Sequence, residues 1–499
     1  MGLQLTVARG ISALSTWGLK NVFRRPAANF PGKIALYVDP HLIADLSGKL
    51  GEGSIVVVGT NGKTTVTNLI ADALEAAGMS VICNRTGANL DSGVATALLH
   101  GKRSDWGVFE SDELWLAKVL PQLQANYLVL LNLFRDQLDR VGEIDRIQDS
   151  IVQTLGKSPN TVLVYNADDP LCEAIALQAA ALPGREATEQ ISFGLVEDMG
   201  LPQNTVADAQ MCQQCSSMLE YGYRQYGQLG AYRCPACGFE RPALDYAADD
   251  IELDADRLSF RLRGPLLSGP GFASESARAS ASRQSESAFG ARSDFSSQQP
   301  SEAACARERI VYAPLSGAYM VYNLAAVAVA AGLAGCSDEA LQRAIDAFDP
   351  QNGRLERLEA GGRPILLNLA KNPTGFNQNL RIIAQDEGPR AVAFFVNDKE
   401  GDGRDVSWIW DIDFEELADA DDLVVFAGGI RKNDLQVRLK YAGIESELID
   451  GPADMLDRTK GLSLEYSYYL IANYTALPVV RGELMRMIEQ DGGTEERKA

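Results

Sequence analysis

A glycine-rich turn containing a lysine follows a short β-branched run near the start of the chain. The run covers residues 54–58, and the turn reads Gly59-Thr60-Asn61-Gly62-Lys63-Thr64-Thr65. Glycines let backbone N–H groups turn toward phosphate oxygens, and the N-terminus of a following helix adds its dipole. We therefore predict a phosphate-binding loop in which Lys63 reaches the β- and γ-phosphates and the Thr64 hydroxyl ligates Mg²⁺. The loop departs from the strict G-x-x-x-x-G-K-[ST] pattern because residue 57 is valine.

Carboxylates follow two further predicted strands. Glu110, Asp112 and Glu113 end one strand, and the segment Asn166-Ala167-Asp168-Asp169-Pro170 follows another. Carboxylates at the C-terminal edge of a parallel sheet, beside a phosphate loop, suit Mg²⁺. Each group is also compatible with a solvated acidic turn.

Four of the eight cysteines form two C-x₂-C pairs, Cys212 with Cys215 and Cys234 with Cys237. Two such pairs at this spacing can close a tetrahedral Cys₄ zinc site, which leaves no open position for catalysis. We predict a structural zinc ribbon over residues 208–242. Such a ribbon can also bind nucleic acid, but Arg224 and Arg233 are the only basic residues between the pairs. Eight cysteines in 499 residues are too few for a disulfide scaffold, so a reducing compartment is expected.

Composition narrows the class of protein. The formal net charge is −21, which makes the chain a poor general binder of nucleic acid. The first 38 residues are the exception, because they contain five Lys or Arg and no Asp or Glu. They predict a basic amphipathic helix that either packs on its own domain or lies on an anionic membrane surface. Residues 314–337 carry no charge, but their Ala/Gly-rich sequence indicates a buried core helix rather than a transmembrane span.

Strand patterns alternate with helical patterns, which predicts an α/β fold with mostly parallel sheets. Strands are expected over residues 54–58, 81–83, 108–110, 127–131 and 161–165, and later over 364–369, 391–396, 423–427 and 469–472. We divide the chain into an N-terminal basic extension (1–50), an ATPase-type domain (51–350) and a C-terminal α/β domain (355–499). Residues 268–304 are a low-complexity Ser-rich insertion, which we predict to be disordered.

Several of these motifs together resemble the Mur ligases, and among them the MurT family. The resemblance rests on the phosphate loop, on residues 166–170, and on the segments Asn132-Leu133-Phe134-Arg135-Asp136-Gln137-Leu138-Asp139-Arg140, Tyr322-Asn323-Leu324-Ala325-Ala326 and Gly353-Arg354. The inserted four-cysteine ribbon and the segment Asp402-Gly403-Arg404-Asp405-Val406-Ser407-Trp408-Ile409-Trp410-Asp411 are typical of MurT. The resemblance covers residues 35–485 apart from the Ser-rich insertion. It implies a Mur-ligase central P-loop domain followed by a C-terminal α/β domain.

The resemblance also implies a reaction and its cofactors, ATP, Mg²⁺ and Zn²⁺. MurT-type subunits amidate the α-carboxylate of D-glutamate in the lipid II stem peptide, through an acyl phosphate, to give D-isoglutamine. Carried over to this chain, Glu110 helps Thr64 bind Mg²⁺, Asn323 and Asp168 lie near the adenine or ribose, and Arg354 lies near the phosphates. Many Mur ligases have Asp-His-Leu-Asp where this chain has residues 136–139, Asp-Gln-Leu-Asp, so a second metal site is not predicted.

The source of ammonia is expected to be a second subunit. A glutaminase needs a Cys nucleophile with a His base, but this chain has only His41 and His100, and no cysteine in a G-x-C-x-G turn. The resemblance implies a GatD-like glutaminase partner in a heterodimer, whose Cys-His pair is completed by an Asp of this chain. The matching position is Asp405, with Asp411 as the second choice. Taken alone, Asp405 is also compatible with a cap of the next segment.

Two other functions remain open from the sequence. One is an amino-acid-adding ligase of the Mur or folylpolyglutamate type, although only about 50 residues precede the phosphate-loop strand, fewer than the substrate domain of those enzymes. The other is a nucleotide-switched binding protein that uses the zinc ribbon for interaction. The expected location is the cytoplasm, with access to lipid II at the inner membrane surface and without a transmembrane span.

Overall fold

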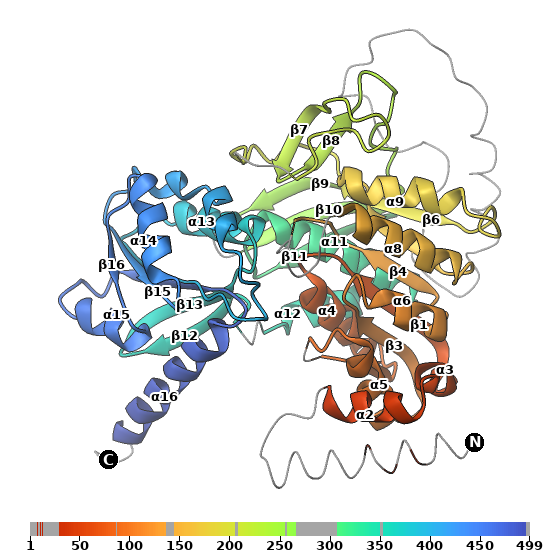
Figure 1. The fold of residues 1–499 in the computed structure, drawn as a ribbon, viewed down its shortest axis with the longest axis horizontal. Coiled ribbons are helices and arrows are strands. Elements are labelled where there is room, and N and C mark those ends of the chain that lie inside the picture. Colours follow the sequence, from red (N-terminus) through yellow and green to blue (C-terminus); the bar gives the residue numbers. More distant parts are fainter. Residues whose placement is uncertain are drawn as a thin grey trace.

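The structure is a computed structural model that describes residues 29–85, 87–135, 144–204, 208–254, 257–265, 307–349 and 353–495, and three isolated positions before residue 29. Figure 1 shows two units side by side, each built on its own sheet. The predicted amphipathic helix before residue 29, the Ser-rich insertion 268–304 and residues 136–139 lie outside the described residues.

The larger unit is built on a nine-stranded sheet in the order β11-β10-β9-β6-β5-β4-β1-β3-β2. Its strands from β2 to β9 pair in parallel, whereas β10 runs antiparallel to both β9 and β11. The strands are β1 (Leu50–Val58), β2 (Val81–Cys83), β3 (Ser104–Glu110), β4 (Tyr127–Leu130), β5 (Val162–Asn166), β6 (Gln190–Leu195), β9 (Tyr246–Leu253), β10 (Leu258–Gly264) and β11 (Arg307–Ala313).

Helices cover both faces of this sheet, as expected where parallel strands are joined by crossovers. One face carries α4 (Lys63–Ala76), α11 (Ala318–Leu333) and α12 (Asp338–Asp346). The other carries α2 (Phe30–Val38), α3 (Leu42–Ser47), α5 (Asp91–His100), α6 (Leu116–Leu123), α8 (Ile144–Gly156) and α9 (Pro170–Ala180). Helix α11 is the buried core helix predicted for residues 314–337. Within the described ranges, no helix has the length and apolarity needed to cross a bilayer.

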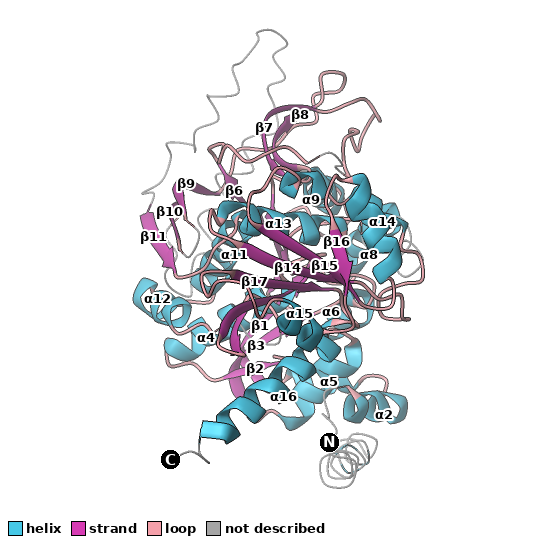
Figure 2. Cartoon of the chain, turned by 90° about the vertical axis from the view of Figure 1, so that its left-hand side faces the viewer, coloured by secondary structure: helices cyan, strands magenta, loops and turns pink. Residues whose placement is uncertain are grey.

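The smaller, C-terminal unit has a six-stranded sheet in the order β12-β13-β17-β14-β15-β16, in which only β12 is antiparallel to its neighbour. Helices lie on both of its faces (Figure 2). Its strands are β12 (Glu356–Ala360), β13 (Arg363–Leu369), β14 (Arg390–Phe395), β15 (Leu423–Gly428), β16 (Ser446–Leu448) and β17 (Ser467–Ala472). Its helices are α13 (Pro373–Gln385), η3 (Ser407–Asp411), η4 (Phe414–Leu417), α14 (Lys432–Tyr441), α15 (Pro452–Arg458) and α16 (Leu477–Glu495).

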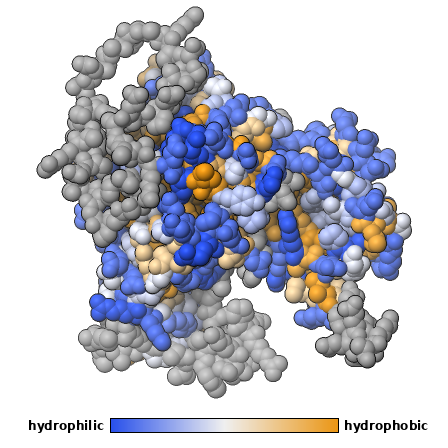
Figure 3. Space-filling view, turned by 180° about the vertical axis from the view of Figure 1, so that it is seen from behind, coloured by the Kyte–Doolittle hydropathy of each residue, from blue (hydrophilic) through white to orange (hydrophobic). Residues whose placement is uncertain are grey.

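A separate antiparallel hairpin, β7 (Glu220–Tyr226) and β8 (Leu229–Arg233), projects between β6 and β9 in the sequence and carries the four cysteines at its base. Tyr232 and Phe239 of this ribbon pack with Ala174 of α9, which fixes it to the larger unit. The predicted α/β fold with an inserted ribbon and a C-terminal α/β unit is therefore confirmed. Hydrophilic side chains cover most of the described surface seen from behind (Figure 3).

Candidate active site between the two sheets

The predicted phosphate loop connects β1 to α4, with glycines at the two positions where the backbone has positive φ. Gly59 has φ +140° and Gly62 has φ +88°. A Cβ atom on Gly62 would lie 2.3 Å from Oδ1 of Asn323, which belongs to α11. Only glycine allows this close approach, so the backbone of the loop packs directly on the Asn323 side chain of α11.

The loop is held in place by residues at the end of β4. The Asn61 N–H donates to Oδ1 of Asn132 at 2.9 Å, and the Thr60 hydroxyl accepts from the Phe134 N–H at 2.9 Å. The Thr60 N–H also donates to the Asn132 carbonyl at 2.9 Å. The Asn132-Leu133-Phe134 segment therefore supports the phosphate loop directly.

Lys63 lies at the first position of α4 and is almost fully buried. Its Nζ donates to the Gly59 carbonyl at 2.5 Å and lies 3.2 Å from Oε1 of Glu113. Burial acts to lower the pKa of Lys63, but the nearby charges of Glu113 and Glu110 outweigh it and raise the pKa. The ammonium group is therefore held charged and pointed along the loop.

Thr64 and Glu110 bring together two oxygen groups that can act as metal ligands. The Thr64 hydroxyl donates to Oε2 of Glu110 at 2.7 Å, and Asn89 Nδ2 donates to the other carboxylate oxygen at 3.3 Å. A hydroxyl and a carboxylate are the ligands that Mg²⁺ prefers beside a phosphate loop, so this pair fits the metal.

Arg354 extends the same cluster from the C-terminal side. Its guanidinium donates to the Thr64 hydroxyl at 3.1 Å, across 290 positions of sequence. Burial lowers the pKa of Arg354, and Glu110 opposes that effect. In this arrangement of the two units, the Arg354 side chain thus places a positive charge beside the phosphate loop.

One cavity contains most of the predicted nucleotide-site residues. From the larger unit it is lined by Thr60, Asn61, Gly62, Lys63, Thr64, Thr65, Glu110 and Asn323, and Arg354 closes it. Leu315, Tyr319, Met320 and Phe348 add an apolar section, and Asn368, Lys371, Thr374, Gln378 and Tyr474 line it from the C-terminal unit.

Asp168 and Gly59 are not among the residues that line this cavity. The Asp168 carboxylate is completely buried, where it accepts from Arg241 at 3.0 Å, the Tyr322 hydroxyl at 2.7 Å and the Leu195 N–H at 2.9 Å. Burial raises the pKa of Asp168 and Arg241 opposes the shift. In this structure Asp168 therefore ties the ribbon to α11 rather than facing the cavity.

Several lining residues were not singled out by the sequence. Lys371 follows β13 and acts with Lys63 to lower the pKa of the Glu113 carboxyl, against burial, which raises it. Asn372 caps α13 by accepting from the Gly375 N–H at 2.8 Å. Ala370-Lys371-Asn372-Pro373 directly follows a predicted strand and has the composition of a strand-to-helix turn, which is the sequence signal that could have marked Lys371.

The four ribbon cysteines meet at one point. Their sulfur atoms all lie within 4.8 Å of one another, with Cys212 3.5 Å from Cys237 and Cys215 3.5 Å from Cys234. Each pair closes a similar turn: Ser216 N–H donates to the Cys212 carbonyl at 2.9 Å, and Gly238 N–H to the Cys234 carbonyl at 3.1 Å. Four thiolates in two such turns can hold one tetrahedral metal ion.

The carboxylates of the Asp402–Asp411 segment have three different surroundings. Asp402 is buried, and its carboxylate accepts a hydrogen bond from the Thr475 N–H at 2.9 Å. Asp411 forms an ion pair with Arg135 of the larger unit. Asp405 is exposed and accepts from the Ser407 N–H at 2.8 Å and the Ser407 hydroxyl at 2.9 Å, and these bonds lower its pKa. The cap geometry considered for Asp405 is thus present, and its carboxylate is also at the surface.

Two family models match this chain. Residues 57–214 match the Mur ligase middle domain, and residues 369–477 match the MurT ligase C-terminal domain. The fold is similar to solved Mur-type ligases. A pseudomurein peptide ligase type C from Methanothermus fervidus has a TM-score of 0.59 at 18% identity, covering 89% of this chain and 80% of that one. MurF from Thermotoga maritima, solved with ADP, has a TM-score of 0.58 at 14% identity, covering 96% and 87%.

Curated relatives align along nearly the whole chain. The MurT subunit of the glutamine-hydrolysing lipid II isoglutaminyl synthase of Streptococcus pneumoniae is 30% identical over 458 residues, 90% of each chain. The MurT subunit from Staphylococcus aureus is 27% identical, covering 92% of this chain and 93% of that one. The Mur-ligase-like fold predicted from the motifs is confirmed, and this protein belongs to the MurT family of ATP-dependent, Mur-type ligases.

Proposed function

We propose that this chain is the amidating subunit of a two-subunit enzyme that acts in peptidoglycan synthesis. It converts the α-carboxylate of D-glutamate in the lipid II stem peptide to the amide of D-isoglutamine, using ATP and ammonia. The observation that carries the proposal is the cavity in which the phosphate loop, the Thr64–Glu110 pair and Arg354 meet side chains of the C-terminal unit. The relationship to MurT subunits over nine-tenths of the chain supports the choice of substrate.

The reaction has two balanced steps. A carboxylate oxygen of the substrate attacks the γ-phosphorus of ATP, and the bond to ADP breaks, which gives an acyl phosphate. Ammonia then attacks the acyl carbon, phosphate leaves, and the nitrogen loses a proton to leave the amide. Phosphorylation is needed because a carboxylate is a poor electrophile, and the phosphoryl transfer is assisted by fixed positive charge.

The residues of the cavity have separate roles in that scheme. Lys63 and Arg354 place cationic groups at the phosphate end, and Glu113 orients Lys63 through its ion pair. Thr64 and Glu110 hold Mg²⁺, which when bound neutralises phosphate charge. Asn323 fixes the loop from the α11 side. Asp168 acts at a distance in this proposal, by holding Tyr322, the neighbour of Asn323, rather than by touching nucleotide.

Glu110→Gln tests the proposed metal ligand. The substitution keeps the size of the side chain but removes its charge, so we expect the Mg²⁺ concentration for half-maximal ATP turnover to rise by about tenfold or more. A magnesium titration of turnover measures this effect. Asp72→Asn, which alters a partly exposed ion pair between α4 and Arg85, is the matched control and is expected to titrate like the unchanged protein. An unchanged magnesium dependence of Glu110→Gln would contradict the assignment.

Ammonia is proposed to come from a GatD-like glutaminase subunit. His41 stands at the N-terminus of α3 and His100 at the end of α5, both exposed, while Cys172 and Cys336 are buried in the core. The residues that a Cys-His glutaminase pair needs are therefore proposed to belong to the partner, with Asp405 of this chain as the third member.

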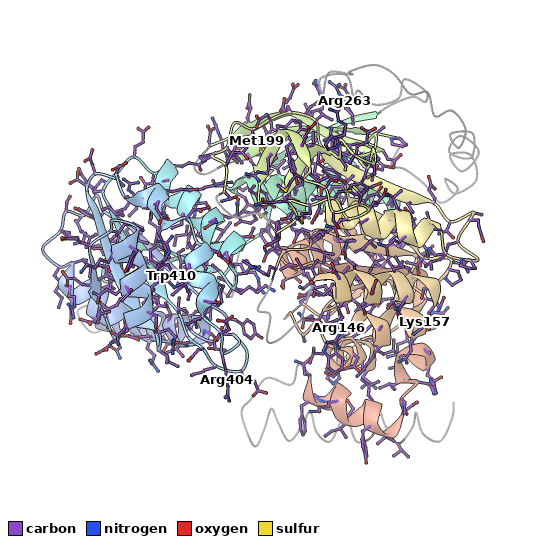
Figure 4. The ribbon with its side chains drawn as sticks, turned by 45° about the horizontal axis from the view of Figure 1, so that its top comes forward. Arg146, Lys157, Met199, Arg263, Arg404 and Trp410 are labelled. Atoms are coloured by element: carbon purple, nitrogen blue, oxygen red, sulfur yellow. The ribbon has the colours of Figure 1, made fainter. Side chains whose placement is uncertain are left out.

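The segment that carries Asp405 also carries an exposed aromatic residue. Trp410 is 51% exposed and Tyr441 is 76% exposed, and their rings meet edge to face with centroids 5.5 Å apart. Figure 4 places Arg404 and Trp410 on the C-terminal unit. Aromatic residues and arginine are enriched at protein interfaces. We therefore propose that this face binds the glutaminase.

The ribbon metal is proposed to be zinc in a structural role. Cys212→Ser removes one of four ligands, so we expect loss of most bound zinc and a melting temperature several degrees lower. Zinc content by plasma emission spectrometry and a thermal melt measure the two effects. Cys83→Ser, outside the ribbon, is the control and is expected to keep its zinc. Full zinc content in a folded Cys212→Ser protein would show that the cluster is not the zinc site.

The whole proposal is tested by measuring ATP turnover with purified lipid II, with ammonium or with glutamine plus the glutaminase. We expect ADP and amidated lipid II in equal amounts, with ammonium sufficient when the glutaminase is absent. A ligase that adds an amino acid would need that amino acid and ignore ammonium. A nucleotide switch would hydrolyse ATP without consuming lipid II. Because lipid II is membrane-bound, we place the reaction at the inner face of the membrane.

A further inference from the structure

The tip of the ribbon hairpin reaches the cavity, far from the cysteines at its base. Tyr226 ends β7 and is the one ribbon residue among those that line the cavity. Its ring stacks on Phe134, with centroids 6.0 Å apart, and meets Tyr322 edge to face at 5.9 Å. Phe134 in turn binds Thr60 of the phosphate loop. The Tyr226 side chain therefore contacts Phe134, which supports the phosphate loop, and Tyr322, which belongs to α11.

The hairpin tip is held by close contacts with the larger unit. Gly227 has φ +55°, and a Cβ atom there would lie 2.7 Å from the Phe134 ring. Gln228 Nε2 donates to the Leu133 carbonyl at 2.7 Å, and the Gly230 N–H donates to the Asp168 carbonyl at 2.9 Å. Such close contacts leave the position of the Tyr226 ring little freedom.

The C-terminal unit also forms hydrogen bonds with the hairpin tip and with Asn204 beside it. Arg381 of α13 donates to the Gln225 carbonyl at 3.3 Å and to Oδ1 of Asn204 at 3.1 Å. Asn204 itself accepts from the Gly227 N–H at 2.9 Å. The hairpin tip thus contacts both units, and Tyr226 within it lines the cavity to which both units contribute.

Two kinds of side chain line the cavity. The phosphate loop, Lys63 and Arg354 contribute polar and cationic groups to the lining, whereas Leu315, Tyr319, Met320 and Phe348 contribute apolar and aromatic groups. A nucleotide has the same division, because its phosphates are charged and its base is a flat ring that stacks on aromatic side chains. Tyr226 belongs to the same hydrophobic cluster as Leu315 and Met320, against which Tyr319 and Phe348 pack, and it lines the cavity with them.

We propose that the ribbon hairpin is a wall of the nucleotide cavity, and that Tyr226 packs against the purine base. The four-cysteine cluster then has a definite task, because β8 runs directly into Cys234 and metal binding fixes the base of the hairpin whose tip carries Tyr226. This inference rests on the proposed binding of ATP in the cavity.

A base contact can be separated from a general structural effect by comparing two ligands. ADP carries the base, whereas inorganic triphosphate occupies the phosphate end without it. For Tyr226→Ala, we expect the dissociation constant of ADP, measured by calorimetry, to rise by about tenfold, with triphosphate binding unchanged. Tyr226→Phe keeps the ring and is expected to restore ADP binding to within about twofold. Met218→Ala, at an exposed ribbon position, is the matched control.

The outcomes distinguish this inference from the proposed function. If the unchanged protein binds neither ligand, the nucleotide site itself is wrong. If it binds both and Tyr226→Ala binds ADP equally well, or loses ADP and triphosphate alike, the base contact is overturned. Cys237→Ser tests the role of the ribbon metal: we expect lower metal content together with weaker ADP binding and unchanged triphosphate binding. Metal loss with normal ADP affinity would refute the link between ribbon and cavity.

Discussion

Lys63→Ala is expected to abolish amidation from either nitrogen source, ammonium or glutamine with the glutaminase. The Lys63 ammonium is buried, held along the phosphate loop by the Gly59 carbonyl and paired with Glu113. Its removal takes a fixed positive charge from a site shielded from water and leaves Glu113 without that cation, so the site becomes more repulsive to ATP. We expect turnover to fall by about a hundredfold or more, measured as ADP release with lipid II present.

Two variants show whether such a loss is specific. Lys157→Ala removes an exposed lysine after α8 and is expected to keep full activity and an unchanged melting temperature. Glu113→Gln keeps Lys63 but removes its ion-pair partner, and we expect a smaller loss than for Lys63→Ala because the cation remains. Substantial ATP-dependent amidation by a folded Lys63→Ala protein would overturn the assignment of the phosphate loop.

The features that could be predicted from the sequence are those whose cause is local. The β-branched run before Gly59 predicted a strand, and the structure places β1 inside the larger sheet, between β3 and β4, with residues 54–58 buried. The same holds for the two C-x₂-C turns, because each turn is closed by hydrogen bonds within a few residues. The uncharged segment 314–337 predicted a core helix, and almost every residue of α11 is buried.

Contacts between distant segments could not be predicted in this way. Asp168 follows a strand end as expected, yet its carboxylate is taken up by Arg241 and Tyr322, 73 and 154 positions away. Tyr226 belongs to a ribbon that the sequence marked only as a metal site, and its place in the cavity depends on how the hairpin packs on Phe134. Lys371 lines the cavity because the C-terminal sheet faces the phosphate loop, an arrangement that no local pattern encodes.

Asp405→Asn is expected to abolish amidation that depends on glutamine and to spare amidation that depends on ammonium. The carboxylate is at the surface of the C-terminal unit, on the same segment as Trp410, which belongs to the face that we propose for the glutaminase. There it would orient and stabilise the charged histidine of the partner, as the acidic member of a catalytic triad does. Loss of that charge is expected to lower glutamine hydrolysis by the complex about a thousandfold. Asp405 does not line the synthetase cavity, so we expect the variant to keep its ammonium-dependent activity.

The cap formed by Asp405 provides the control for this prediction. Asparagine can still accept hydrogen bonds from Ser407, so Asp405→Asn keeps the turn before η3 and removes only the charge. Ser407→Ala does the reverse, because it removes one bond to the carboxylate and leaves the charge in place. We therefore expect Ser407→Ala to retain most glutamine-dependent activity. If Ser407→Ala lost that activity and Asp405→Asn kept it, Asp405 would be only a cap. If Asp405→Asn lost ammonium-dependent activity as well, the residue would belong to the synthetase reaction.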